Sequence, residues 1–96
     1  MRVISRSILR AFAEKHRETE TALDGWYRVA RRVEWANFAE VRATFPATDK
    51  VGELYVFNVG GNRVRLIAAI HFNARKLYVR HVLTHQEYDR GHWKNG

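Results

Sequence analysis

Three stretches of strand-like residues follow one another between Leu54 and Gln86, and they constrain the fold more than any other feature of the chain. Successive residues of a strand point to opposite faces of a sheet, so this period of two sorts the polar side chains onto its faces. Glycine and asparagine at positions 60–62 accept positive φ at low cost and predict a tight hairpin turn, and positions 73–75 predict a second turn. The sequence therefore predicts a three-stranded antiparallel meander formed by residues 54–59, 64–72 and 76–83.

The first half of the chain has the pattern of helices that would pack on this sheet. Residues 2–4 are a short run with strand character, and Ser5 and Thr19 are good N-cap residues for helices that follow them. Apolar residues then recur at helical spacing, and Pro46 ends the last of these segments. The expected helices cover residues 6–15, 20–33 and 38–45. We predict an α+β fold in which an antiparallel sheet, made of the N-terminal strand and the meander, carries two to three helices on one face.

The segment where the sheet is expected carries charge of one sign only. Residues 54–86 contain five Lys or Arg and three His but no Asp or Glu, and the whole chain has a formal net charge of +7. Of its 17 basic residues 13 are Arg, whose planar guanidinium matches a phosphate with two parallel hydrogen bonds. The pattern favours an anionic partner such as RNA. The alternative is a solvated sheet face that carries ordinary surface charge.

Alternation along the strands assigns side chains to the two faces of the sheet. The face expected to meet the helices holds Val64, Leu66, Ala68, Ile70 and Phe72, and on the last strand Leu77, Val79, His81 and Leu83. The opposite, open face holds Arg63, Arg65, Ile67, Ala69 and His71, and on the last strand Tyr78, Arg80, Val82 and Thr84. Arg65 and Arg80 would then lie on adjacent strands of one face, where two guanidinium groups can bracket a phosphate.

Candidate proton-transfer groups follow the last strand. His85, Tyr88 and Asp89 bring an imidazole, a phenol and a carboxylate within five residues, and an imidazole exchanges protons near neutral pH. Thr84 with Glu87 three residues later is a capping box, so a short helix should begin there. Tyr88 has an alternative role as an aromatic that holds this turn against the sheet. The polar tail, residues 91–96, is expected to fray.

Composition excludes several classes of site. There is no Cys, which excludes a disulfide framework, a thiol nucleophile and a thiolate metal site. The spacing of His81 and His85 superficially resembles a metal pair, but the expected break from strand to helix separates them, so we expect no metal and no cofactor. Arginines interrupt the N-terminal apolar run, which argues against a signal peptide, and no stretch is long enough to span a membrane. We therefore expect a cytoplasmic protein of one domain, residues 1–96.

Two stretches resemble the HigB toxin family of type II toxin–antitoxin systems. They are residues 55–67, YVFNVGGNRVRLI, and residues 77–89, LYVRHVLTHQEYD, and the segments 1–5 and 44–47 also fit. The resemblance implies a RelE-like fold and an endonuclease that cleaves mRNA on the ribosome and so inhibits translation. It also implies a partner, a helix-turn-helix antitoxin of the HigA type. The toxin would contact operator DNA only as part of its complex with this antitoxin. Residues that match the family's sheet arginines and C-terminal motif are Arg65, Arg80, His85, Tyr88 and Asp89.

The expected reaction is attack of a ribose 2′-hydroxyl on its own 3′-phosphate without a metal. Arg65 and Arg80 would stabilise the charge on phosphorus, and His85 with Tyr88 would carry the proton transfers. The residues expected to contact RNA outside this centre are Asn62, Arg63, Lys76 and His71. The alternative is a non-catalytic RNA- or ribosome-binding module, which needs the basic sheet but not His85. A DNA-binding repressor is disfavoured, because no pair of helices shows a basic recognition face.

Overall fold

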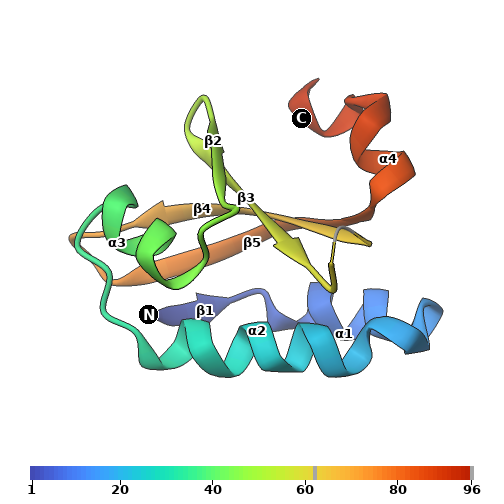
Figure 1. The fold of residues 1–96 in the computed structure, drawn as a ribbon, viewed down its shortest axis with the longest axis horizontal. Coiled ribbons are helices and arrows are strands. Elements are labelled where there is room, and N and C mark those ends of the chain that lie inside the picture. The colour runs from blue at the N-terminus through green and yellow to red at the C-terminus, as the bar shows by residue number, and fades with distance from the viewer. Residues whose placement is uncertain (62, 96) are drawn as a thin grey trace.

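A five-stranded mixed sheet forms the centre of the computed structural model, which describes residues 1–61 and 63–95 (Figure 1). Its strand order is β1-β5-β4-β3-β2. The strands are β1 (Arg2–Ile4), β2 (Asp49–Val51), β3 (Leu54–Val59), β4 (Val64–His71) and β5 (Lys76–Thr84). The helices are α1 (Arg6–Lys15), α2 (Glu20–Arg32), α3 (Phe38–Thr44) and α4 (His85–Arg90), with short 3-10 turns η1 (Arg17–Thr19) and η2 (His92–Asn95). Of these described helices, none has both the length and the apolar character that crossing a bilayer requires.

The predicted α+β class and the meander are confirmed. Strands β3, β4 and β5 pair antiparallel in sequence order, and α1 and α2 cover one face of the sheet (Figure 1). One part of the expected topology is wrong, because β1 pairs with β5 in parallel, with Val3 opposite Leu77. The chain passes through α1, α2 and α3 before it returns to the sheet, and such a long connection permits a parallel pair, which a hairpin cannot make. A second difference is β2, three residues that extend the other edge antiparallel to β3.

An aromatic cluster joins the helices to the sheet. Phe57 on β3 is fully buried, and its ring lies 5.3 Å from that of Trp26 on α2, 6.2 Å from that of Trp35 and 5.6 Å from that of Phe45. Edge-to-face and offset-stacked pairs of this kind stabilise a core beyond the area they bury. The inner face predicted for the middle strand is confirmed, since the same cluster contains Val64, Leu66, Ala68, Ile70 and Phe72.

A β-bulge interrupts the pairing of β4 with β5. Ile67 lies opposite His81, but the next residue, Ala68, lies opposite Val79. Arg80 is therefore the extra residue on β5. A bulge sets two residues of one strand against one residue of its partner, so the alternation of faces shifts by one position at this point.

The face assignments made for the end of β5 are therefore wrong. His81 and Leu83 were expected to face the helices, but they share the face of Ile67, which we call the outer face because it lies away from α1 and α2. Val82 and Thr84 were expected on that outer face and instead lie on the inner one, where Val82 joins the main core. A prediction from strict alternation leaves out a bulge, because it assumes that every residue pairs one to one with the partner strand.

The outer face is covered in its middle by the C-terminal segment. Trp93 in η2 is only 5% exposed and packs with Val56 and Ile67 in a second apolar cluster. Its indole NH donates to the backbone oxygen of Tyr88 over 3.1 Å, and the two rings stack with centroids 5.2 Å apart. The tail was expected to fray, and for residues 91–95 this is wrong; Gly96 lies outside the described residues.

The predicted capping box at the start of α4 is confirmed. The hydroxyl of Thr84 accepts from the backbone NH of Glu87 over 3.2 Å, and the Glu87 carboxylate accepts from the backbone NH of Thr84 over 2.9 Å. The two other predicted caps are wrong at the side-chain level. Ser5 has φ 71° and makes no capping bond, and the Thr19 hydroxyl donates instead to the backbone oxygen of His16.

The capping box predicts a pH-dependent contribution to stability. The backbone hydrogen bond from Thr84 is the main cause that lowers the pKa of the Glu87 carboxyl below its ordinary 4.5. A carboxyl with a lowered folded-state pKa stabilises the fold above its unfolded pKa, and this contribution is lost as pH falls through the folded-state pKa. We expect Glu87→Gln to lower the free energy of unfolding near neutral pH, with a deficit that shrinks as the pH falls below the ordinary pKa of 4.5.

Urea unfolding at a series of pH values measures this difference. The exposed residue Glu53, in the turn between β2 and β3, supplies the control Glu53→Gln. Thr84→Ala should cost about 1 kcal/mol, as for other lost N-caps. A Glu87→Gln deficit that stays constant over the whole pH range would contradict the role assigned to the carboxylate.

Candidate functional site

Four side chains meet where the outer face adjoins α4. Arg65 Nη2 lies 3.3 Å from His85 Nδ1, and His85 Nε2 lies 3.2 Å from Asp89 Oδ2. The Arg65 guanidinium carbon also lies 5.5 Å from the centroid of the Tyr88 ring, within the range of a cation–π contact. The structure thus brings together three of the predicted catalytic residues, Arg65, His85 and Tyr88, and adds Asp89. We call these four residues the Arg65–His85 cluster.

Strand pairing and helix geometry explain why these side chains converge. Arg65 lies opposite Leu83, so its side chain emerges on the outer face two residues before β5 gives way to α4. The backbone NH of His85 still donates to the backbone oxygen of Arg63 over 3.1 Å, which fixes the first residue of the helix against β4. His85 and Asp89 are four residues apart on one helix face and so become neighbours. The capping box at Thr84 determines where that helix begins.

Hydrogen bonding defines the tautomer of His85. A guanidinium can only donate, so Nδ1 of the imidazole must accept from Arg65. The single ring proton of the neutral imidazole is then on Nε2, where it points to the Asp89 carboxylate. The side chains of His85 and Asp89 are 53% and 60% exposed. The ring is therefore oriented from both nitrogens and still accessible to a substrate.

Arg80 shares the outer face with this cluster but stands apart from it. Val79 before it belongs to the main core, so Arg80 points to the opposite side, as predicted, and is exposed. Arg80 lies three residues from Leu83, the partner of Arg65, which corresponds to about 10 Å along the strand. Two long arginine side chains can span that separation around one bound phosphate ester.

Two outer-face residues next to the cluster were missed as candidates. His81 was assigned to the core, but it lies beside Arg80 at the bulge, half-buried. The consecutive polar pair Arg80-His81 in an otherwise alternating strand is the signal that could have revealed the bulge. Asn58 on β3 lies directly opposite Arg65 and is exposed, so its amide is adjacent to the cluster.

The other predicted RNA contacts are distributed along the sheet. Arg63 is exposed beside the start of α4. His71 and Lys76 lie opposite each other at the far end of the β4–β5 pair, about 20 Å along the strand from Arg65, and the His71 ring lies 5.1 Å from that of Tyr78. Asn62 lies outside the described residues. The basic residues thus follow the length of the strands.

A groove of about 470 Å³ continues from His85 toward the end of α1. Its walls include Arg63 and Gln86 on one side and Phe12 and His16 on the other, with those two rings stacked at 4.4 Å. Its lining also includes the acidic residue Glu18. Over residues 1–61 and 63–95, no three His, Asp or Glu side chains gather closely enough to hold a metal ion.

The chain is similar to known proteins over most of its length. A family model for the HigB toxin, described as a RelE-like toxic component of a toxin–antitoxin system, matches residues 19–91. The mRNA interferase HigB of Escherichia coli O6:H1 is 34% identical over 93 residues, which cover 94% of this chain and 90% of the relative. The mRNA interferase toxin HigB of Escherichia coli strain K12 and the mRNA interferase HigB of Shigella flexneri are each 36% identical over 92 residues, which cover 93% of this chain and 88% of each relative. The chain belongs to the HigB toxin family.

Proposed function

We propose that this chain is an mRNA endonuclease that acts on the ribosome without a metal, and that residues 1–96 work as one cytoplasmic toxin domain. The observation that carries the proposal is the hydrogen-bonded row Arg65–His85–Asp89, which is accessible and lies at the end of a sheet region without acidic residues. A cation, an oriented imidazole and a carboxylate are sufficient for RNA cleavage by transesterification. The relatives' name, mRNA interferase, supports the same activity.

The contacts of His85 support a proposed direction for the proton transfers. When a phosphate binds the Arg65 guanidinium, the hydrogen bond to His85 Nδ1 is released and that lone pair becomes available to the substrate. Nδ1 removes the proton of the ribose 2′-hydroxyl, the 2′-oxygen bonds to phosphorus, and the bond from phosphorus to the 5′-oxygen breaks. The products are a 2′,3′-cyclic phosphate and a 5′-hydroxyl, whose proton is supplied by the Tyr88 phenol.

The remaining residues support this step. Asp89 accepts a hydrogen bond from Nε2–H and stabilises the imidazolium that forms, as a carboxylate does behind other catalytic histidines. Tyr88, whose ring contacts both Arg65 and Trp93, is the second proton-transfer group. Arg80 adds positive charge near the phosphorus atom as its charge develops.

Partners follow from the family and the charge. The basic residues along β4 and β5 give sequence-independent affinity for ribosomal RNA through phosphate contacts and counterion release. The inhibitor is a helix-turn-helix antitoxin of the HigA type, and operator DNA is reached only through it.

The proposal predicts growth arrest. Production of this chain without its antitoxin should stop bacterial growth and deplete translated messages, because cleavage on the ribosome removes mRNA in use. Primer extension on a translated and an untranslated copy of one message tests the dependence on ribosomes. Normal growth with intact messages at high soluble expression would refute the proposal.

His85→Gln should separate cutting from binding. Glutamine retains polarity but cannot exchange a proton near neutral pH, and loss of general acid–base catalysis costs roughly 10²- to 10⁴-fold in rate. Ribosome binding depends mainly on phosphate contacts and should be retained with the same salt dependence. Co-sedimentation with ribosomes and primer extension measure the two properties. Cleavage at the wild-type rate would exclude His85, and simultaneous loss of binding would favour a non-catalytic RNA-binding module.

Arg80→Ala should reduce cleavage without affecting the fold. Removal of a group that stabilises transition-state charge costs about 2 to 4 kcal/mol in the activation barrier. The exposed Arg32 on α2 provides the matched control Arg32→Ala, which removes the same charge on the opposite side of the sheet. Single-turnover cleavage and thermal melting are measured together. A fully active Arg80→Ala variant would remove Arg80 from the site, and an unfolded one would show a structural role.

A further inference from the structure

The groove of about 470 Å³ beside His85 has a wall that the proposed mechanism does not use. This wall is the end of α1, where the imidazole of His16 stacks on the buried ring of Phe12, with the ring centroids 4.4 Å apart and the planes inclined by 29°. The His16 side chain is still 35% exposed and lines the groove. An aromatic ring that another ring supports and that remains accessible is a surface on which a nucleobase can stack.

The backbone around His16 is fixed by hydrogen bonds within the chain. The NH of His16 donates to the backbone oxygen of Phe12 over 2.9 Å. The backbone oxygen of His16 accepts from the NH of Thr19 over 2.9 Å and from the Thr19 hydroxyl over 2.6 Å. Thr19 itself is buried. A ring on such a backbone loses little freedom when a base stacks on it, so little of the stacking energy is lost to ordering the protein.

A carboxylate lies at the edge of this ring. Glu18 Oε1 is 3.8 Å from His16 Nδ1, and the exposed Glu18 side chain lines the same groove. A carboxylate only accepts hydrogen bonds, so it pairs with N–H groups and repels a phosphate. The Watson–Crick edge of guanine presents two adjacent N–H donors, whereas that of uracil presents one N–H between two carbonyl oxygens. A base stacked on His16 therefore meets at its edge a group that favours guanine and disfavours uracil.

We propose that this groove is a nucleobase subsite that binds a guanine next to the scissile phosphate. The assignment rests on the proposed function, because His85 belongs both to the groove and to the Arg65–His85 cluster, so one RNA strand occupies both. His16 stacks on the guanine, and Glu18 accepts from its Watson–Crick edge. Arg63, which is exposed and lines the same groove, binds the phosphate of that nucleotide. Residues outside the catalytic cluster thus give cleavage a sequence preference.

Mononucleotides test the subsite without cleavage, because they contain no scissile bond. The full-length protein is titrated with 5′-GMP and with 5′-UMP, and the histidine ring protons are followed by NMR. GMP should move the His16 resonance through the ring current of the stacked base, with an apparent dissociation constant roughly 5- to 100-fold below that of UMP. Glu18→Gln should remove this preference, since an amide both donates and accepts.

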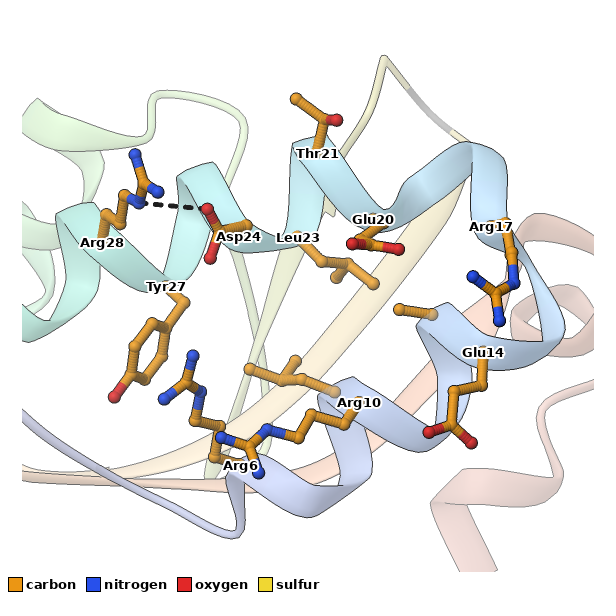
Figure 2. Close-up of a pocket in the computed structure, with 12 residues that line it drawn as sticks. Arg6, Arg10, Glu14, Arg17, Glu20, Thr21, Leu23, Asp24, Tyr27 and Arg28 are labelled. Atoms are coloured by element: carbon orange, nitrogen blue, oxygen red, sulfur yellow. Dashed lines mark ion pairs between the residues drawn. The ribbon is translucent and has the colours of Figure 1, made fainter.

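A matched control removes the same charge outside the subsite. Glu14 is an exposed residue of α1 that lines a separate groove between α1 and α2 (Figure 2). Glu14→Gln should therefore keep the preference for GMP within about three-fold of wild type. His16→Ala should weaken GMP binding roughly 5- to 100-fold, while His16→Phe retains a stacking surface and should bind GMP nearly as wild type does. Ligand resonances report binding to these two variants, and thermal melting establishes that each variant is folded.

The outcomes separate the subsite from the proposed function. A shift at His85 without one at His16 would overturn the subsite and leave the proposed function standing. Equal affinity for GMP and UMP, or an unchanged preference in Glu18→Gln, would overturn the assignment of guanine. A His16 shift with a preference for GMP, in a protein that cleaves no message, would support the subsite and refute only the proposed function.

Discussion

Burial of the central strand β4 on both faces is the constraint on which the rest of the structure depends. Leu66 and Ala68 are fully buried against the helices, while Ile67 between them is fully buried on the outer face. Because the middle of β4 has no solvated face, other side chains must pack on both of its faces. The aromatic cluster around Phe57 supplies one cover, and the stacked pair Tyr88 and Trp93 supplies the other. The C-terminal segment is therefore part of the core.

The Arg65–His85 cluster forms where this outer cover ends. Tyr88 has two functions there, since one ring both stacks on Trp93 and contacts the Arg65 guanidinium. The capping box makes α4 begin at His85, and the hydrogen bond from the backbone NH of His85 to the backbone oxygen of Arg63 holds this first residue beside β4. The Arg65 guanidinium lies beside the stacked rings of Tyr88 and Trp93, which restricts its movement. The packing of these rings therefore helps to fix the geometry of the Arg65–His85 cluster.

Local patterns were sufficient to predict the meander, its turns and the three N-terminal helices. They also placed Arg65, His85 and Tyr88 near one another, because the capping box at Thr84 is a local signal and Arg65 lies on the strand beside it. The features that were not predicted depend on distant partners. The bulge at Arg80 is defined by β4, the burial of Trp93 by Val56 and Ile67, and the parallel direction of β1 by the free edge of β5.

The pairing of β1 with β5 also has a consequence for synthesis of the chain. Val3 is translated 74 residues before Leu77, its partner in the sheet. Contacts between such distant positions carry a large loop-closure entropy and form late. The sheet edge therefore cannot close until most of the chain has been translated, and the residues that surround His85 emerge later still. The Arg65–His85 cluster is therefore among the last parts of the described fold to be completed.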